Sequence, residues 1–377
     1  MRDFLAKKVK DIKPSGIRKF FDIASEIEGA ISLGVGEPDF DTPWHIREEG
    51  IYSLEQGKTI YTSNAGLKEL RMEICSYMNR KYGLEYAWDK NVLVTVGGSE
   101  AIDVALRSMV EPGDEVIIPS PCYVSYEPCA VLAGAVVKTI PLKNENEFRL
   151  TPQELEEAIT PRSKILILNY PNNPTGAIME RKDLEAIAEV ILRHDLFVIS
   201  DEIYAELSYL KRHESIAAIE GMKERCLVIN GFSKTFSMTG WRLGYACGPE
   251  EILKQMTKIH QFAIMCAPTT SQYAAVEALK NGDRSVEGMR EAYNERRRYV
   301  VYRLREMGLP CFMPQGAFYV FPDIRGFGLS SEAFALELLK KEKVVVVPGT
   351  AFGEFGEGYI RLSYATSMQC LEQGLQE

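Results

Sequence analysis

Short apolar runs alternate with amphipathic segments through the middle of the chain, over residues 60–270. Apolar runs with polar ends are typical of strands that a sheet buries on both faces. Such strands are expected at 91–96, 115–120, 163–170, 196–200, 226–231 and 245–248. Helical spacing of apolar residues predicts helices at 183–195 and at 99–110, the latter beginning with Ser99 as its cap. This alternation predicts an α/β fold with a mostly parallel sheet flanked by helices.

The pattern changes after about residue 275. A long charged amphipathic helix is expected at 287–308, and we interpret its arginine-rich side as a solvated face. Strands are expected at 316–324, 343–349 and 358–365, which together with this helix predict a smaller α+β domain. A chain of 377 residues exceeds what one hydrophobic core usually supports. The expected parts are an N-terminal segment (1–40) that joins the small domain, a large domain (41–274) and a small domain (275–377).

Composition narrows the possible functions. The chain is 46% hydrophobic and 26% charged, which is typical of a globular protein. Its net charge of −9 argues against a nucleic-acid partner, and no apolar run is long enough to span a membrane. The N-terminus lacks the apolar core of a secretory signal, and the eight cysteines have neither zinc-ligand nor disulfide spacing. We therefore expect a cytoplasmic protein without a metal site.

Polar residues follow the predicted strands directly. In mostly parallel sheets, ligands gather beyond the carboxyl ends of the strands. The polar clusters at these ends are Gly97–Ser99, Ser120–Tyr123, Asn169–Gly176, Ser200–Tyr204 and Ser233–Lys234. Loops are polar in any protein, but the mixture of acid, amide, phenol and amine exceeds what turns require. The sequence therefore predicts one binding site at this edge of the sheet.

Lys234 is the residue with the most distinctive surroundings. It stands in GFSKTFSMTGWRLGYACG, among hydroxyl side chains and eight residues before Arg242. An amine that is sheltered and close to a positive charge has a lowered pKa and can form a Schiff base. On a scaffold of this class, that chemistry suggests pyridoxal phosphate as the cofactor.

Pyridoxal phosphate needs an anion site, an acid opposite its ring nitrogen and donors at its phenolic oxygen. The anion site is expected where TVGGSEA ends a strand and opens a helix, with added contacts from Ser99, Ser233 and Arg242. Asp201 can keep a ring nitrogen protonated, since an opposite charge favours the charged form. The remaining donors are Asn173 and Tyr204. Each motif alone is typical of a turn or a strand end, so it is their combination that indicates the cofactor.

The sequence resembles the class I/II, fold-type-I pyridoxal-phosphate aminotransferases, especially the prokaryotic aspartate, alanine and aromatic enzymes. The matching motifs follow the family's order along nearly the whole chain: GVGEPDFDTP, YTSNAGLKELR, NYPNNPTG, SDEIY, GFSKTFSMTGWRLGY, GAFYVF and RLSYA. The resemblance implies that Lys234 carries the cofactor and moves a proton, and that Asp201 pairs with the ring nitrogen. It implies phosphate contacts at Gly98, Ser99, Ser233 and Arg242, phenolic-oxygen contacts at Asn173 and Tyr204, and ring stacking at Tyr123.

The resemblance also implies a substrate site and a partner subunit. Arg361 and Gly36 are implied to bind the substrate α-carboxylate, together with Asn173. A planar guanidinium matches a carboxylate bidentately, although a strand arginine taken by itself is as often a surface residue. Tyr61 is implied to reach the cofactor phosphate of the neighbouring subunit, so that a homodimer shares its active sites.

The implied reaction moves an amino group from an L-amino acid of the aspartate, aromatic or alanine class to a 2-oxo acid, by a ping-pong mechanism. We expect 2-oxoglutarate as the acceptor. A carbon–sulfur β-lyase would use the same cofactor residues and is the alternative. A ligand-sensing regulator would need a DNA-binding module, for which the N-terminus offers no basic extension. No second arginine is assignable to a side-chain carboxylate, so the preferred amino acid stays open. The sequence ends with LSYATSMQCLEQGLQE, which is shorter than the terminal helix usual in the family, and this predicts a reduced small domain.

Overall fold

A seven-stranded sheet forms the centre of the computed structural model, which describes residues 2–14, 16–17, 20, 23 and 27–376. The strand order is β2–β8–β7–β6–β5–β3–β4, and only β8 runs antiparallel to its neighbours. The strands are β2 (Val92–Thr95), β3 (Glu115–Ser120), β4 (Val136–Pro141), β5 (Ser163–Asn169), β6 (Phe197–Asp201), β7 (Cys226–Gly231) and β8 (Gly244–Cys247). The predicted α/β fold with a mostly parallel sheet is confirmed.

Helices cover both faces of this sheet, which explains why its strands are apolar throughout. In β5, Ile165 and Ile167 point to one face, while Leu166 and Leu168 point to the other. The first face is covered by α5 (Gly97–Met109), α6 (Tyr126–Ala133) and α9 (Glu250–Ala263). The second is covered by α4 (Lys68–Tyr82), α8 (Arg181–Arg193), α10 (Thr269–Asn281) and α7 (Pro152–Ala158), which lies between α8 and β4, while α3 (Trp44–Glu55) packs on α10. Burying each such Ile or Leu contributes about 1.5–3 kcal/mol relative to exposure.

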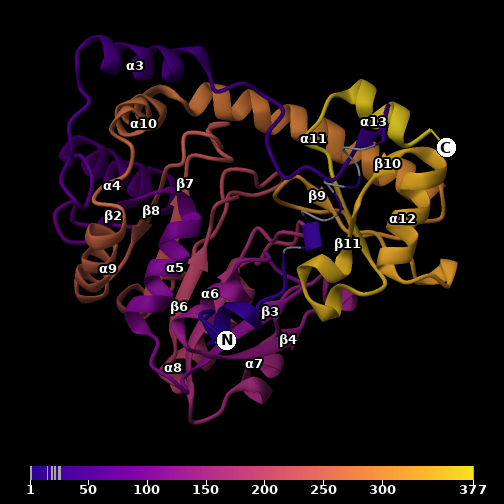
Figure 1. Ribbon diagram of the computed structural model, residues 1–377, viewed down its shortest axis with the longest axis horizontal. Helices are drawn as coiled ribbons and strands as arrows, with labels where there is room; N and C mark the ends of the chain where they lie inside the picture. Colours follow the sequence, from indigo (N-terminus) through magenta and orange to yellow (C-terminus); the bar gives the residue numbers. More distant parts are fainter. Residues whose placement is uncertain (1, 15, 18–19, 21–22, 24–26, 377) are drawn as a thin grey trace.

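A second group of elements lies beside the large sheet, on the right in Figure 1. The strand β1 (Ile31–Ser32) pairs in parallel with β10 (Val344–Val345). An antiparallel sheet contains β11 (Val347–Pro348), β12 (Ile360–Ser363) and β9 (Tyr319–Val320). The helices of this group are α11 (Asp283–Glu306), α12 (Ser331–Glu342) and α13 (Met368–Gly374), and they share a hydrophobic core of their own with its strands.

Two details of the sequence-based expectations change here. The single strand expected at 343–349 is two strands, because β10 pairs with β1 and β11 pairs with β12 in another sheet. The helix expected at 287–308 begins at Asp283 and buries Met289, Tyr293 and Val300 along one side. The boundaries at residues 40 and 274 stay predictions. Within the described residues, no helix combines the length and apolar character needed to cross a membrane.

The parallel strands β5, β6 and β7 end at the same edge of the large sheet. Their register places Asn169 beside Asp201, and Asp201 beside Ile229. The amide of Asn169 also donates to the backbone carbonyl of Asp201 at 3.4 Å. This edge is where the polar clusters of the sequence come together.

Candidate active site

A cavity of about 620 Å³ lies between the carboxyl edge of the large sheet and the strands β9 and β12. Eleven of the residues singled out from the sequence line it, and they come from segments far apart in the chain. These residues are Gly36, Gly98, Ser99, Tyr123, Asn173, Asp201, Tyr204, Ser233, Lys234, Arg242 and Arg361. The fold therefore brings an amine, a carboxylate, two guanidinium groups and two phenols around one space.

Lys234 follows β7 and extends its amine across the cavity. The Nζ atom donates a hydrogen bond to the carbonyl oxygen of Gly36 at 2.7 Å. Burial lowers the pKa of the Lys234 ammonium to about 8, and the positive charges of Arg361 and Arg242 act in the same direction. The carboxylate of Glu37 opposes them. A larger fraction of this amine is therefore neutral near pH 8 than for a solvated lysine, as a nucleophile or a general base requires.

Asp201 is a buried carboxylate at the end of β6. One oxygen accepts from the Tyr126 hydroxyl at 2.6 Å, and the other accepts from the Ile203 backbone N–H at 3.2 Å. Burial raises the pKa of Asp201 to about 6, although both hydrogen bonds act to lower it. No cationic side chain of the described residues forms an ion pair with it. A buried carboxylate is costly without a cation, so this position suits a positively charged ligand atom.

Arg361, on β12, is a buried cation with neutral partners. Its Nη1 donates to Asn173 Oδ1 at 2.9 Å, and its Nη2 donates to the Gly34 carbonyl at 2.6 Å. Its Nε is buried without a partner among the described residues. The guanidinium also lies over the Tyr319 ring, 4.2 Å from the centroid. A planar cation held this way, with an unused donor, suits a carboxylate ligand.

The anion site predicted from TVGGSEA has a different helix start from the expected one. The helix α5 begins at Gly97, and no side chain caps it in the position predicted for Ser99. Gly97 has a φ of +73°, which favours glycine, and a Cβ atom there would lie 2.6 Å from Arg242 Nη2. Ser99 therefore lies in the first turn of the helix, where its backbone N–H has no partner within the helix. The turn at Gly97, the backbone N–H groups of Gly98 and Ser99, and the Arg242 side chain form the predicted anion site, the glycine cradle. Arg242 Nη1 also donates to the Thr239 carbonyl at 2.9 Å.

The sequence profile of the family described as "Aminotransferase class I and II" matches residues 28–377. The chain belongs to this family. It is 52% identical over its whole length to a putative aminotransferase, YugH, of Bacillus subtilis, and covers 97% of that protein. It is 47% identical to aromatic-amino-acid aminotransferase 2 of Thermococcus litoralis, with 98% and 96% of the two chains covered. The aspartate aminotransferase of Thermus thermophilus solved with maleate has a TM-score of 0.95 at 40% identity, covering 100% and 98%.

The protein is therefore an aminotransferase, and enzymes of this family depend on pyridoxal phosphate. The residues present fit that cofactor on two observations of the structure. The unpaired, buried Asp201 carboxylate has the charge that a protonated ring nitrogen requires, and the cradle at Gly97 has no room for a side chain. The carbon–sulfur β-lyase is not favoured, since these relatives and structures are all aminotransferases.

Among the residues lining the aminotransferase cavity that the sequence reasoning did not assign are Tyr126, Tyr319 and Glu37. Tyr126 lies three residues after Tyr123 and has the appearance of a core aromatic, yet its hydroxyl bonds to Asp201. The Tyr319 hydroxyl lies 2.7 Å from that of Tyr204. The motif GAFYVF was the only signal for Tyr319, because its contacts join distant parts of the chain.

Tyr61 is the one predicted site residue that lies outside the cavity of this chain. Its side chain is 78% exposed, next to Ile60 at 79%. A role at the cofactor would therefore need a second subunit, and that role stays a prediction.

Proposed function

We propose that this aminotransferase moves the amino group of an L-amino acid of the aspartate, aromatic or alanine class to 2-oxoglutarate. The observation that supports this best is that two buried charges without an ion-pair partner among the described residues, Arg361 and Asp201, line the same cavity as the Lys234 amine. Arg361 suits the carboxylate that amino acids and 2-oxo acids share. Asp201 suits the ring of the cofactor.

The cofactor contacts that we infer follow the walls of the cavity. Lys234 would hold the cofactor covalently, Asp201 would accept a hydrogen bond from its ring nitrogen, and Tyr123 would stack on the ring. Asn173 and Tyr204 would donate to the phenolic oxygen. The phosphate is assigned to the cradle of Gly98, Ser99, Ser233 and Arg242.

When bound, pyridoxal phosphate supplies an electron-accepting ring that stabilises negative charge at the substrate α-carbon. Arg361 and Gly36 hold the substrate carboxylate, which fixes the direction of the α C–H bond. With substrate bound, the Lys234 Nζ atom would act as the general base that accepts the α-proton, and the resulting ammonium would return this proton from the same side of the site. Burial lowers the pKa of this amine to about 8, which suits both accepting and returning a proton.

We infer a ping-pong order, which the shared use of Arg361 by both substrates supports. The amino acid and the 2-oxo acid both carry the group that Arg361 recognises, so they compete for it. The first 2-oxo acid product must leave before the acceptor binds. Double-reciprocal plots of initial rate against amino-acid concentration, at several fixed acceptor concentrations, are therefore expected to be parallel lines. Intersecting lines would contradict this order.

The decisive experiment for the substrate is a panel of L-amino acids with 2-oxoglutarate, followed by product formation and by the absorbance of the cofactor. Activity with aspartate or aromatic amino acids supports the proposal, and broad activity is expected. Release of pyruvate and ammonia from cystathionine without any 2-oxo acid would instead identify a lyase. The related names include both aspartate and aromatic enzymes, so the panel must contain both classes.

We also infer a cytoplasmic homodimer with the three parts 1–40, 41–274 and 275–377. Exposed apolar side chains at Ile60, Tyr61 and Phe262, the last 84% exposed, support an interface. The Asn64 side chain donates to the Met265 carbonyl at 2.8 Å, which holds the two segments together.

A mixed dimer tests whether Tyr61 serves the neighbouring site. Lys234→Ala and Tyr61→Ala subunits, each with low activity alone, are combined by coexpression. If Tyr61 acts across the interface, one of the two sites keeps both residues and activity returns. If the mixture is no more active than the separate variants, the shared site is wrong.

A further inference from the structure

The first turn of α5 is tied to α9 by two side chains that the reaction does not use. Glu100 lies just after the glycine cradle, and His260 lies in α9. The His260 Nδ1 atom and the Glu100 Oε1 atom are 2.5 Å apart. The His260 side chain is fully buried and that of Glu100 is 11% exposed.

The other oxygen of Glu100 is bonded to the backbone that enters the cradle. Its Oε2 atom accepts from the Val96 N–H at 2.5 Å. The neighbouring Thr95 hydroxyl donates to the Gly97 carbonyl at 2.9 Å. Two side-chain contacts thus fix the turn at Gly97 on both sides, in place of the missing helix cap.

This arrangement has a cost that ordinary core packing does not explain. A carboxylate close to a phosphate site opposes the phosphate by like charge. The second nitrogen of His260, Nε2, is buried without a partner among the described residues. Buried polar groups of this kind usually persist where the contact they make elsewhere is needed.

We propose that Glu100 and His260 form a positioning pair that holds the backbone N–H groups of Gly98 and Ser99 in place for the cofactor phosphate. This inference rests on the proposed phosphate site. His260 fixes the carboxylate, the carboxylate fixes the Val96 peptide, and the Val96 peptide fixes the turn. Neither side chain touches the cofactor.

The test measures the binding of pyridoxal phosphate to the cofactor-free protein and to its variants. Glu100→Ala removes both contacts and is expected to bind the cofactor about tenfold to hundredfold more weakly, the usual effect of losing a charge-assisted hydrogen bond. Glu100→Gln keeps an acceptor for Val96, and its amide N–H can donate to His260 Nδ1 when the ring proton lies on Nε2, so binding is expected to stay within about threefold of the wild type. Wild-type affinity in Glu100→Ala overturns the proposal.

Binding of pyridoxal, which lacks the phosphate, distinguishes a disturbed phosphate site from a general loss of structure. Its binding is expected to be unchanged in Glu100→Ala, because only the phosphate cradle is disturbed. A melting temperature that falls while both affinities stay the same would mean a merely structural pair. His194→Ala is the control, since His194 bonds to Glu156 at the same 2.5 Å, is more exposed than His260, and does not line the cavity.

Two further results keep the test decisive. If Glu100→Ala does not fold, His260→Phe replaces it, with about fivefold weaker cofactor binding expected from the loss of one hydrogen bond. Unchanged binding in that variant also overturns the pair. A wild-type protein that binds no pyridoxal phosphate would contradict the proposed function itself, whatever the variants do.

Discussion

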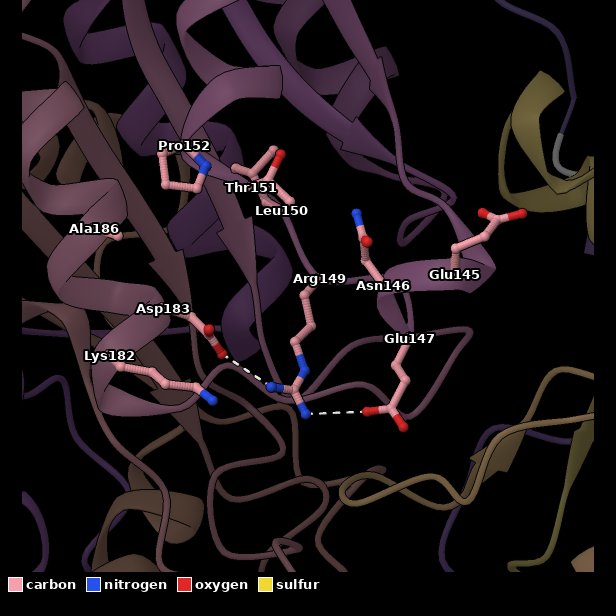
Figure 2. A pocket seen from close by; sticks show the side chains of 10 residues that line it. All are labelled: Glu145, Asn146, Glu147, Arg149, Leu150, Thr151, Pro152, Lys182, Asp183 and Ala186. Atoms are coloured by element: carbon pink, nitrogen blue, oxygen red, sulfur yellow. Dashed lines mark hydrogen bonds and ion pairs between the residues drawn. The ribbon is translucent and has the colours of Figure 1, made fainter.

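Two hollows of nearly equal size differ in whether their charged residues form ion pairs. The cavity at the sheet edge has about 620 Å³, and a hollow between residues 145 and 186 has about 590 Å³ (Figure 2). In the second, Arg149 bonds to Asp183 at 3.1 Å and to Glu147 at 3.0 Å. In the first, Asp201 and Arg361 are buried with neutral partners alone among the described residues.

The difference shows that volume alone does not mark a binding site. A charge that already has an opposite partner gains little from a ligand, whereas a buried charge with neutral partners gains a great deal. The cofactor-free cavity therefore destabilises the fold, and binding of cofactor and substrate relieves that cost. The following variants test this comparison, beginning with the largest expected effect.

Replacing the amine itself should have the largest effect. Lys234→Ala removes both the covalent anchor and the general base, so transamination is expected to fall by about 10⁴-fold or more. Lys254→Ala is the control, because Lys254 is exposed and pairs with Glu250. Near-normal turnover in Lys234→Ala, measured with the preferred amino acid and 2-oxoglutarate, would refute the assignment.

The buried guanidinium should come next. Arg361→Lys keeps a positive charge but loses bidentate geometry, so kcat/KM is expected to fall about 100-fold for the amino acid and the 2-oxo acid alike. Arg297→Lys is the matched control, since Arg297 is also buried but donates to Asn294 and to the Pro314 carbonyl. It should lower stability and leave KM unchanged. An Arg361→Lys enzyme with normal KM values would exclude this arginine as the carboxylate ligand.

The buried carboxylate predicts a pH dependence of stability in the cofactor-free protein. The pKa of Asp201 is about 6 in the fold, against an ordinary value of 3.8, so the folded state holds the extra proton between these values. Stability is thus lost as the pH rises through this window. At pH 7, Asp201→Asn is expected to be more stable by up to about 3 kcal/mol, an advantage that disappears near pH 4. Urea unfolding at both pH values measures this, and an equally or less stable Asp201→Asn protein at pH 7 would contradict it.

The smallest effect is expected in the hollow of Figure 2. Arg149→Ala removes two partly exposed ion pairs, and should cost about 1 kcal/mol of unfolding free energy. Activity should stay within about twofold of the wild type, because no ligand is assigned there. A strong loss of activity with an unchanged melting temperature would show that this hollow, too, has a function.

The sequence predicted the large sheet well because a strand buried on both faces leaves a local signal. The run SKILILNY corresponds to β5, and EVIIPS corresponds to β3. The direction of β8 was not readable, since its short apolar run has the same pattern in either direction. Ser99 was misassigned as a cap because the compensating contact comes from Glu100, whose side chain is held by His260, 160 residues away.

The site was predictable as a set of residue types but not as a set of contacts. Asp201 and Lys234 were identified by the strands they follow. The contact between Arg361 and Asn173 joins residues 188 positions apart, and periodicity carries no information at that separation. Tyr126 and Tyr319 were missed for the same reason, since their hydroxyl partners, Asp201 and Tyr204, lie on other elements.

The central claim is that Lys234 holds the cofactor. The most direct measurement reduces the cofactor-loaded protein with borohydride, digests it and finds the modified peptide by mass spectrometry. The expected result is a pyridoxyl group on the peptide that contains Lys234 and on no other lysine. A label on a different lysine, or none on a protein that retains the cofactor, would contradict the account.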